Sequence, residues 1–286
     1  MSLGAETKLS GSYWDGQGEE RAWDDQVRWS YSQAWLKLEQ GFSAHLKPYL
    51  HIPVVMSGVY RDGTPLVRTS ALGDVHSGLV FQPWLARRQK VAIQVDLKSP
   101  TGVEWPGESI GGGANVQNFL TGTGTTNLGA FVLGHALLGD ITRLEARVGG
   151  VLKFPGIVGY VLEEGGFGNG WLDPGDELLG ELNLVFQPTD KLSASVGSTY
   201  SVRTSYWMGT SGESLWGASW EWLADGGSFL DGELGLTWDF GSRWSLEGCV
   251  GRSIRGSDSR PFAALGLEEF SPQPGITGAL GVVGRW

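Results

Sequence analysis

Residues Phe229–Ile254 read FLDGELGLTWDF, then GSR, then WSLEGCVGRSI. In the first half, alternate positions are apolar or glycine: Leu230, Gly232, Leu234, Leu236, Trp238 and Phe240. The positions between them are mostly polar: Asp231, Glu233, Gly235, Thr237 and Asp239. The second half alternates in the same way, and Gly241-Ser242 between the halves suits a tight hairpin turn. A period of two predicts two strands, each with one apolar and one polar face.

The length of these alternating runs separates two kinds of β protein. Each run lasts about 10–12 residues, which is the length that a tilted strand needs to cross a bilayer. A soluble β-sandwich shows the same alternation in shorter strands, and it is kept as an alternative that would need no detergent. The stretch therefore predicts a hairpin that spans a membrane.

Composition is consistent with one large β domain. The chain has 286 residues, with 46 glycines, 14 tryptophans and only 18% charged residues. Glycines suit turns and strands, and tryptophans suit anchoring at a membrane interface. The net charge of −10 argues against nucleic acid as a partner. We expect a single domain over residues 1–286, with residues 1–5 as an N-terminal segment.

Several further features narrow the class of protein. Cys249 is the single cysteine, so an internal disulfide framework is excluded, and we expect this side chain only to fill space. No apolar run reaches about 18 residues, so hydropathy predicts no transmembrane helix. The start MSLGAETKLSG lacks the apolar core of a signal peptide. Because export to the outer membrane requires one, we expect a mature chain whose Met1 is not native.

The rest of the chain repeats the pattern of the opening hairpin. Further strands are expected at 6–14, 27–42, 43–56, 72–84, 90–98, 127–137, 141–152, 177–187, 191–203, 214–223, 261–270 and 275–286. Short joins alternate with long loops, which are expected at 15–26, 57–70, 99–124, 153–176 and 204–213. This is the layout of a bacterial outer-membrane barrel, whose closure removes the exposed sheet edges. The sequence thus predicts an all-β, antiparallel, up-and-down transmembrane barrel.

The expected number of strands depends on whether two segments cross the membrane. If both 214–223 and 261–270 cross the membrane, the barrel has 14 strands by this count of segments, and otherwise it has 12. Both numbers are even, as single-chain bacterial barrels require. Counting segments favours 14.

Two motifs resemble a known family. ALGDVHSGLVFQPW at Ala71–Trp84 is followed by KVAIQVDLKSPTG at Lys90–Gly102, and LKPYLHIPVV precedes them at Leu46–Val55. Together with SRWSLEGCVGRSI and SDSRPFAALGLEEF further on, they resemble the outer-membrane transporters of the "meta-pathway of phenol degradation" family. The resemblance implies a barrel of 12 strands that passes small or aromatic molecules. The chain departs from it by continuing past Phe270 into another strand-like segment.

The polar positions of the alternating strands carry charges of both signs. The candidates for lining a pore are Lys47, Lys90, Asp96, Lys98, Arg143, Glu145, Arg147, Glu177, Glu181, Lys191, Asp231, Glu233 and Glu247. One interpretation is a water-filled pore whose charged lining filters solutes. The other is that ion pairs fill a narrow lumen and hold it shut. Mixed charge argues against strong selectivity for anions or cations.

Tryptophans gather near the expected strand ends. The candidates for the membrane interface are Trp84, Trp216, Trp220, Trp222, Trp238, Trp244 and Trp286. A girdle of amphipathic rings at headgroup level is the default interpretation. For Trp216, Trp220 and Trp222, a sugar- or aromatic-binding platform and a docking face for an envelope protein are the alternatives.

Catalytic and metal sites are not predicted. His76 and Ser77 are adjacent and so point to opposite faces of a strand, while Ser43 and His45 share a face but lie at a short turn. Four scattered histidines argue against a transition-metal site. The acidic loops 15–25 and 163–177 offer oxygen ligands for Ca²⁺ or Mg²⁺, but a solvated loop is the simpler interpretation.

The predicted function is passage of small, aromatic or hydrophobic solutes through the outer membrane of a Gram-negative bacterium. The expected partners are the lipid bilayer, lipopolysaccharide and the solute, with no cofactor and no enzymatic activity. The alternative is a non-conducting barrel that anchors a multiprotein envelope assembly or binds a partner there.

Overall fold

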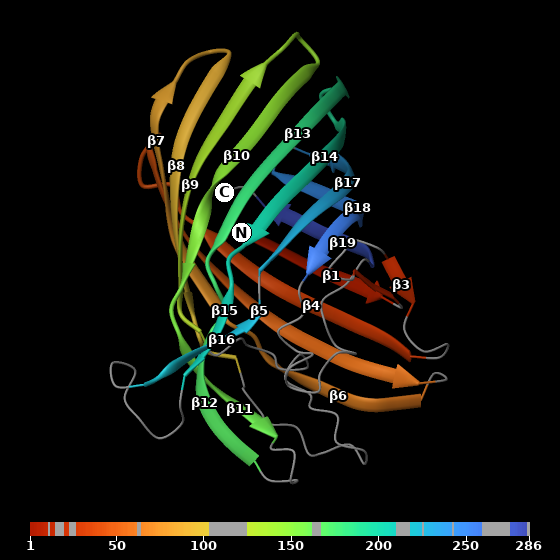
Figure 1. Cartoon of the computed structure of the whole chain (residues 1–286). Helices are drawn as coiled ribbons and strands as arrows, with labels where there is room; N and C mark the ends of the chain where they lie inside the picture. The colour runs from red at the N-terminus through yellow and green to blue at the C-terminus, as the bar shows by residue number, and fades with distance from the viewer. Residues whose placement is uncertain are drawn as a thin grey trace.

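The computed structural model describes residues 1–10, 12–14, 20–22, 27–61, 64–102, 125–161, 167–209, 218–224, 226–241, 243–258 and 275–284. All regular elements in these ranges are β-strands (Figure 1). No helix long and apolar enough to cross a membrane occurs among the described residues.

Twelve of the described strands close into one antiparallel barrel. In ring order they are β1 (Ser2–Ser10), β4 (Val27–Glu39), β5 (Leu46–Arg61), β7 (Val75–Leu85), β8 (Gln89–Ser99), β9 (Asn127–Leu137), β10 (Thr142–Lys153), β13 (Glu177–Thr189), β14 (Leu192–Arg203), β17 (Gly227–Asp239), β18 (Trp244–Asp258) and β19 (Ile276–Gly284). β19 returns to pair with β1, and the β4–β5 pairing completes the ring. The predicted up-and-down barrel is confirmed.

Each barrel strand has one apolar face that points away from the lumen. In β13, the outward side chains Leu182, Leu184 and Phe186 are 51%, 40% and 45% exposed. The inward side chain between the last two, Val185, is only 4% exposed. Exposed apolar side chains recur in this way around the barrel, far beyond the patch that a soluble monomer tolerates. The outer surface is therefore suited to lipid, and the soluble sandwich is excluded.

The two ends of the barrel differ in their connections. Residues 40–45, 86–88, 138–141, 190–191 and 240–243 join neighbouring strands at one end. Backbone hydrogen bonds close these turns, such as Leu138 N to Thr142 O at 2.9 Å and Phe240 N to Trp244 O at 3.0 Å. Gly241 has a φ of +84°, which a residue with a side chain rarely adopts. The longer connections lie at the other end, where β11 and β12 are found (Figure 1).

Additional strands extend the long-loop end. β6 (Thr64–Leu72) pairs with the second half of β5, and β7 pairs with the first half of β5. The two residues Gly73 and Asp74 separate β6 from β7. A separate four-stranded sheet contains β11 (Gly156–Val161), β12 (Phe167–Asp173), β15 (Tyr206–Gly209) and β16 (Trp220–Ala224), and β2 (Ser12–Trp14) pairs with β3 (Glu20–Ala22).

These strands correct several sequence-based expectations. The preference for 14 crossing strands was wrong, because residues 220–223 of the segment 214–223 belong to β16, which lies outside the barrel. Segment 261–270 lies outside the described residues. The expected loop 57–70 contains parts of β5 and β6. The expected loop 153–176 contains β11 and β12, and the expected loop 204–213 contains β15. Residues 2–5, expected in an N-terminal segment, pair with both β19 and β4.

Candidate functional site in the barrel lumen

Alternation along each barrel strand decides which side chains face the lumen. Since the apolar parity is exposed on the outer surface, the other parity points inward. Twelve of the thirteen predicted charged residues lie on this inward parity: Lys47, Lys90, Asp96, Lys98, Arg143, Glu145, Arg147, Glu177, Glu181, Asp231, Glu233 and Glu247. The thirteenth, Lys191, lies in the turn before β14. That these residues line a conducting path stays a prediction.

Arg147 of β10 is the centre of the largest group of inward side chains. Its Nη1 lies 2.8 Å from Oε1 of Glu181, its direct partner in the β10–β13 register. Its Nη2 lies 3.6 Å from Oδ2 of Asp96 in β8. The guanidinium also lies 3.7 Å from the ring centroid of Phe131 in β9, a cation–π contact. One arginine thus connects four consecutive strands of the barrel wall.

Hydrogen bonds carry this group on to β5. The hydroxyl of Tyr49 donates to the Asp96 carboxylate. Nε2 of Gln94 donates to the Tyr49 oxygen at 3.0 Å and to Oδ2 of Asp96 at 2.8 Å. We call Tyr49, Gln94, Asp96, Phe131, Arg147 and Glu181 the arginine network. The arginine network runs along the inner wall from β5 to β13. Its charged hub makes several contacts at once, and these hold the neighbouring side chains in one arrangement.

Glycines leave room for the rings of Tyr49 and Phe131, the two aromatic members of the arginine network, to lie against the barrel wall. A Cβ on Gly78 of β7 would lie 2.5 Å from Cζ of Tyr49. A Cβ on Gly149 of β10 would lie 2.6 Å from Cδ1 of Phe131, and one on Gly129 would lie 2.8 Å from its Cε2. The absence of side chains at these positions lets both rings lie close to the backbone. Phe131 is accordingly only 4% exposed.

We expect Gly78→Ala to destabilise the barrel by about 1–3 kcal/mol, the usual cost of overpacking. The new methyl group would push the Tyr49 ring away from β7 and break its hydrogen bond to Asp96. Urea unfolding of the folded barrel, followed by tryptophan fluorescence, measures the change. Gly180→Ala is the matched control, since nothing lies within 4 Å of a Cβ there. Equal stabilities of the two variants would contradict the proposed packing.

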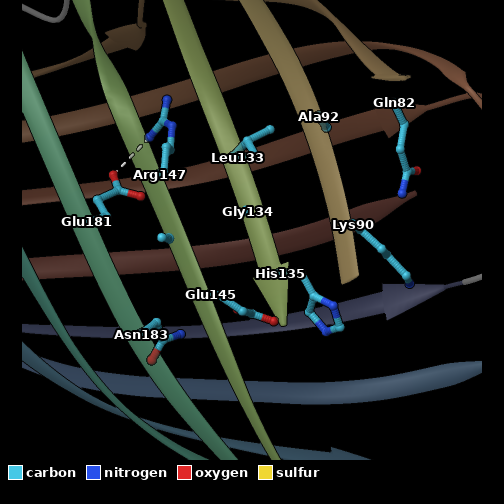
Figure 2. Close-up of a pocket in the computed structure, with 11 residues that line it drawn as sticks. Gln82, Lys90, Ala92, Leu133, Gly134, His135, Glu145, Arg147, Glu181 and Asn183 are labelled. Atoms are coloured by element: carbon cyan, nitrogen blue, oxygen red, sulfur yellow. Dashed lines mark hydrogen bonds and ion pairs between the residues drawn. The ribbon is translucent and has the colours of Figure 1, made fainter. Parts of the chain in front are cut away.

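A hollow of about 340 Å³ lies beside the arginine network (Figure 2). Five consecutive strands line it: β7, β8, β9, β10 and β13. Its apolar or small residues are Ala92, Leu133, Gly134 and Ala146, and its polar residues are Gln82, Lys90, His135, Glu145, Arg147, Glu181 and Asn183. The hollow therefore combines a small apolar surface with charges of both signs, as a solute site does.

Several polar atoms of this hollow have no partner. Nδ1 of His135, Nε of Arg147 and Oδ1 of Asn183 are buried without a hydrogen bond to any described residue. Glu145 is paired, since Nε of Arg143 lies 2.8 Å from its Oε1. Buried polar groups are almost always hydrogen-bonded, so an unpartnered set beside a hollow indicates a place for polar ligand atoms or water.

Two further ion-pair groups lie toward the long-loop end. Nζ of Lys98 lies 2.9 Å from Oδ2 of Asp74, and both side chains are buried. Oδ1 of Asp74 accepts a hydrogen bond from the backbone N–H of Gly102 at 3.0 Å. In the second group, Oε2 of Glu177 lies 3.0 Å from Lys153 Nζ and 3.5 Å from Arg203 Nε. These contacts join strands close to where each continues into a long connection.

The opposite side of the lumen carries several carboxylates. β18 lies six strands from β8 in the ring of twelve, so it faces β8 across the lumen. Asp231 and Glu233 of β17 and Glu247 of β18 point inward there. Oδ1 of Asp231 accepts a hydrogen bond from Ser253 at 2.6 Å. The strand that carries Lys90 thus lies opposite a wall that carries three carboxylates.

The predicted interface tryptophans fall in different places. Trp84, Trp238 and Trp244 lie on barrel strands next to short turns, and the first two are 57% and 51% exposed. Trp220 and Trp222 belong to β16, outside the barrel, and the side chain of Trp222 is not described. Trp216 and Trp286 lie outside the described residues. The girdle stays a prediction, for which the short-turn end supplies three rings.

The structure also places the side chains weighed for catalysis and metal binding. His45 Nδ1 lies 2.6 Å from the backbone oxygen of Gln82, which holds this ring within its short turn beside Ser43. His51 and His76 make an edge contact with ring centroids 5.6 Å apart. In the described part of the chain, no group of three or more His, Cys, Asp or Glu residues could hold a metal ion. The Cys249 thiol is free and half-buried.

Sequence reasoning missed several members of these groups. Tyr49, Phe131 and Gln94 share the inward parity, but their weight in the arginine network depends on neighbours far away in the sequence. Lys153 and Arg203 end their strands on that parity, so the alternation could have included them. Asp74 lies between two strands, where alternation gives no signal.

The comparisons with known proteins agree with this architecture. No family model matches the chain, and no curated protein matches its sequence. The COG4313 outer membrane channel from Pseudomonas putida F1 has a TM-score of 0.68 at 12% identity, over 99% of this chain and 95% of that chain. The NanC porin has a TM-score of 0.51 at 8% identity, over 100% of both chains. This chain and the two solved structures share the barrel fold. At such identities the likeness concerns the fold alone.

Proposed function

We propose that this protein is a channel of the bacterial outer membrane that lets small solutes pass. The observation that carries the proposal is a closed barrel of twelve strands whose charged lumen contains an open hollow of about 340 Å³. The apolar outer surface supports residence in a bilayer. The shared fold with an outer-membrane channel and a porin is consistent with both parts of the proposal.

The class of solute is a finer proposal. The motifs at 71–84 and 90–102 resemble the phenol-degradation transporters, and that resemblance favours small aromatic or hydrophobic molecules. The apolar surface of the hollow is compatible with such molecules. The arginine network, with a basic hub bound to two carboxylates, argues against a strong preference for either ion sign.

We expect the purified chain to produce discrete current steps in a planar bilayer. Glu145→Gln and Asp231→Asn should each lower the permeability ratio of K⁺ to Cl⁻, by up to about twofold for one charge screened by salt. The physical reason is that each variant removes an inward carboxylate, and Glu145→Gln also frees Arg143. Reversal potentials in a KCl gradient measure the ratio.

Folding must be controlled separately from conductance. Heat-modifiable migration on a gel reports the folded barrel for the wild type and each variant. A folded chain that inserts into the bilayer but passes no current would reject the channel. That outcome would direct the search to a protein partner in the envelope, for which co-purification is the direct assay.

A further inference from the structure

Lys90 lines the hollow and has no ion pair with any residue that the structure describes. The two arginines nearby have ion pairs: Arg147 contacts two carboxylates, and Arg143 beside the hollow contacts Glu145. The side chain of Lys90 is exposed to the lumen, and no ion pair joins it to a described residue. Its direct cross-strand partner is His135, whose Nδ1 is unpartnered. One edge of the hollow therefore carries an exposed positive charge that no carboxylate of the described residues neutralises.

The surface next to Lys90 is apolar. Ala92 follows it on the inward parity of β8, and Leu133 is the direct partner of Ala92 in β9. Figure 2 shows Leu133 between Lys90 on one side and Arg147 on the other. Polar residues line the side of the hollow opposite Lys90, among them Arg147 and Asn183. A ligand with a charged end and a compact apolar body fits this spatial arrangement of side chains.

The carboxylates on the wall opposite β8 also favour an anion near Lys90. Asp231, Glu233 and Glu247 point into the lumen from β17 and β18, on the opposite side of the ring from β8. They repel an anion within the lumen toward β8, and Lys90 attracts it there, so the two walls together orient a solute that carries one negative charge.

We propose that this hollow is a binding subsite for a small organic carboxylate carried on a compact apolar body. The inference rests on the proposed function and names its class of solute. Lys90 Nζ holds the carboxylate in a charge-assisted hydrogen bond, and Ala92 and Leu133 contact the apolar body.

The test titrates three probes of one shape against the folded barrel in detergent micelles by isothermal calorimetry. Benzoate carries a carboxylate on an apolar ring, benzamide keeps the shape without charge, and benzylammonium reverses the charge. We expect saturable benzoate binding, with benzamide weaker by about tenfold, since it lacks the charge-assisted bond. Benzylammonium should be the weakest of the three. Equal binding of all three, or no saturable benzoate binding, would overturn the proposal.

A pair of variants localises the binding. Lys90→Gln should weaken benzoate binding by about tenfold and bring it to the level of benzamide. Lys191→Gln makes the same charge change in an exposed turn at the same end of the barrel, outside the hollow, and should leave the affinity unchanged. An equal loss in both variants would mean non-specific attraction and would overturn the subsite.

Conductance separates this inference from the proposed function. If the wild type binds benzoate in micelles but passes no current, the channel is rejected and the subsite stands. If the wild type conducts and benzoate does not bind, the subsite is rejected and the channel stands.

Discussion

Lys98→Met is expected to lower the free energy of unfolding by about 3–5 kcal/mol, the cost of leaving a buried charge without its partner. Lys98 Nζ lies 2.9 Å from Asp74 Oδ2, and the two side chains are 9% and 6% exposed. Asp74 lies in the break between β6 and β7 and also accepts the N–H of Gly102. Urea unfolding of the folded barrel, followed by tryptophan fluorescence, measures the loss.

Two further variants control this result. Lys37→Met breaks an exposed pair with Glu39, whose atoms are 3.6 Å apart, and should cost less than about 1 kcal/mol. Adding Asp74→Asn to Lys98→Met removes the uncompensated charge and should recover part of the stability. If Lys98→Met cost no more than Lys37→Met, the buried pair would not stabilise the barrel wall.

Arg147→Met is expected to raise the permeability ratio of K⁺ to Cl⁻ by roughly threefold, because one full positive charge is lost from the inner wall of the barrel. Glu181 and Asp96 would both lose their counter-ion and present carboxylates to the lumen. The direction is opposite to that of Glu145→Gln. Reversal potentials in a KCl gradient measure the effect.

Charge and geometry can be separated at this position. Arg147→Lys keeps the positive charge but not the planar fork that contacts two carboxylates and the Phe131 ring. It should retain the wild-type permeability ratio. A wild-type ratio in Arg147→Met would instead place the ion path away from the arginine network.

Local patterns predicted the barrel strands where alternation was clean. Asn127–Leu137 was predicted with the bounds that β9 has, and the opening hairpin became β17 and β18. The same reasoning failed at 57–70, because the turn residues around 62 and 63 suggested a loop over the whole segment. Strong turn chemistry marks the tip of a hairpin but does not set how far its strands extend.

The strand number required the tertiary structure. SLWGASWEWL at 214–223 alternates like a crossing strand, yet the described part of it, β16, pairs with β15 in a separate sheet. Alternation reports that a segment has two different faces, and it does not report which sheet the segment joins. Only the closed ring of pairings distinguishes twelve strands from fourteen.

For the candidate site, the sequence by itself determined which face each charged residue occupies. Successive strand residues point to opposite sides, so Asp96, Arg147 and Glu181 were assigned to the lumen without knowing their neighbours. The tertiary structure decided that these three meet, that Tyr49 and Phe131 join them, and that Lys90 has no ion pair with a described residue. The physical reason is that a side chain's face is a local property of its strand, whereas its contacts depend on register and closure between strands far apart in the chain.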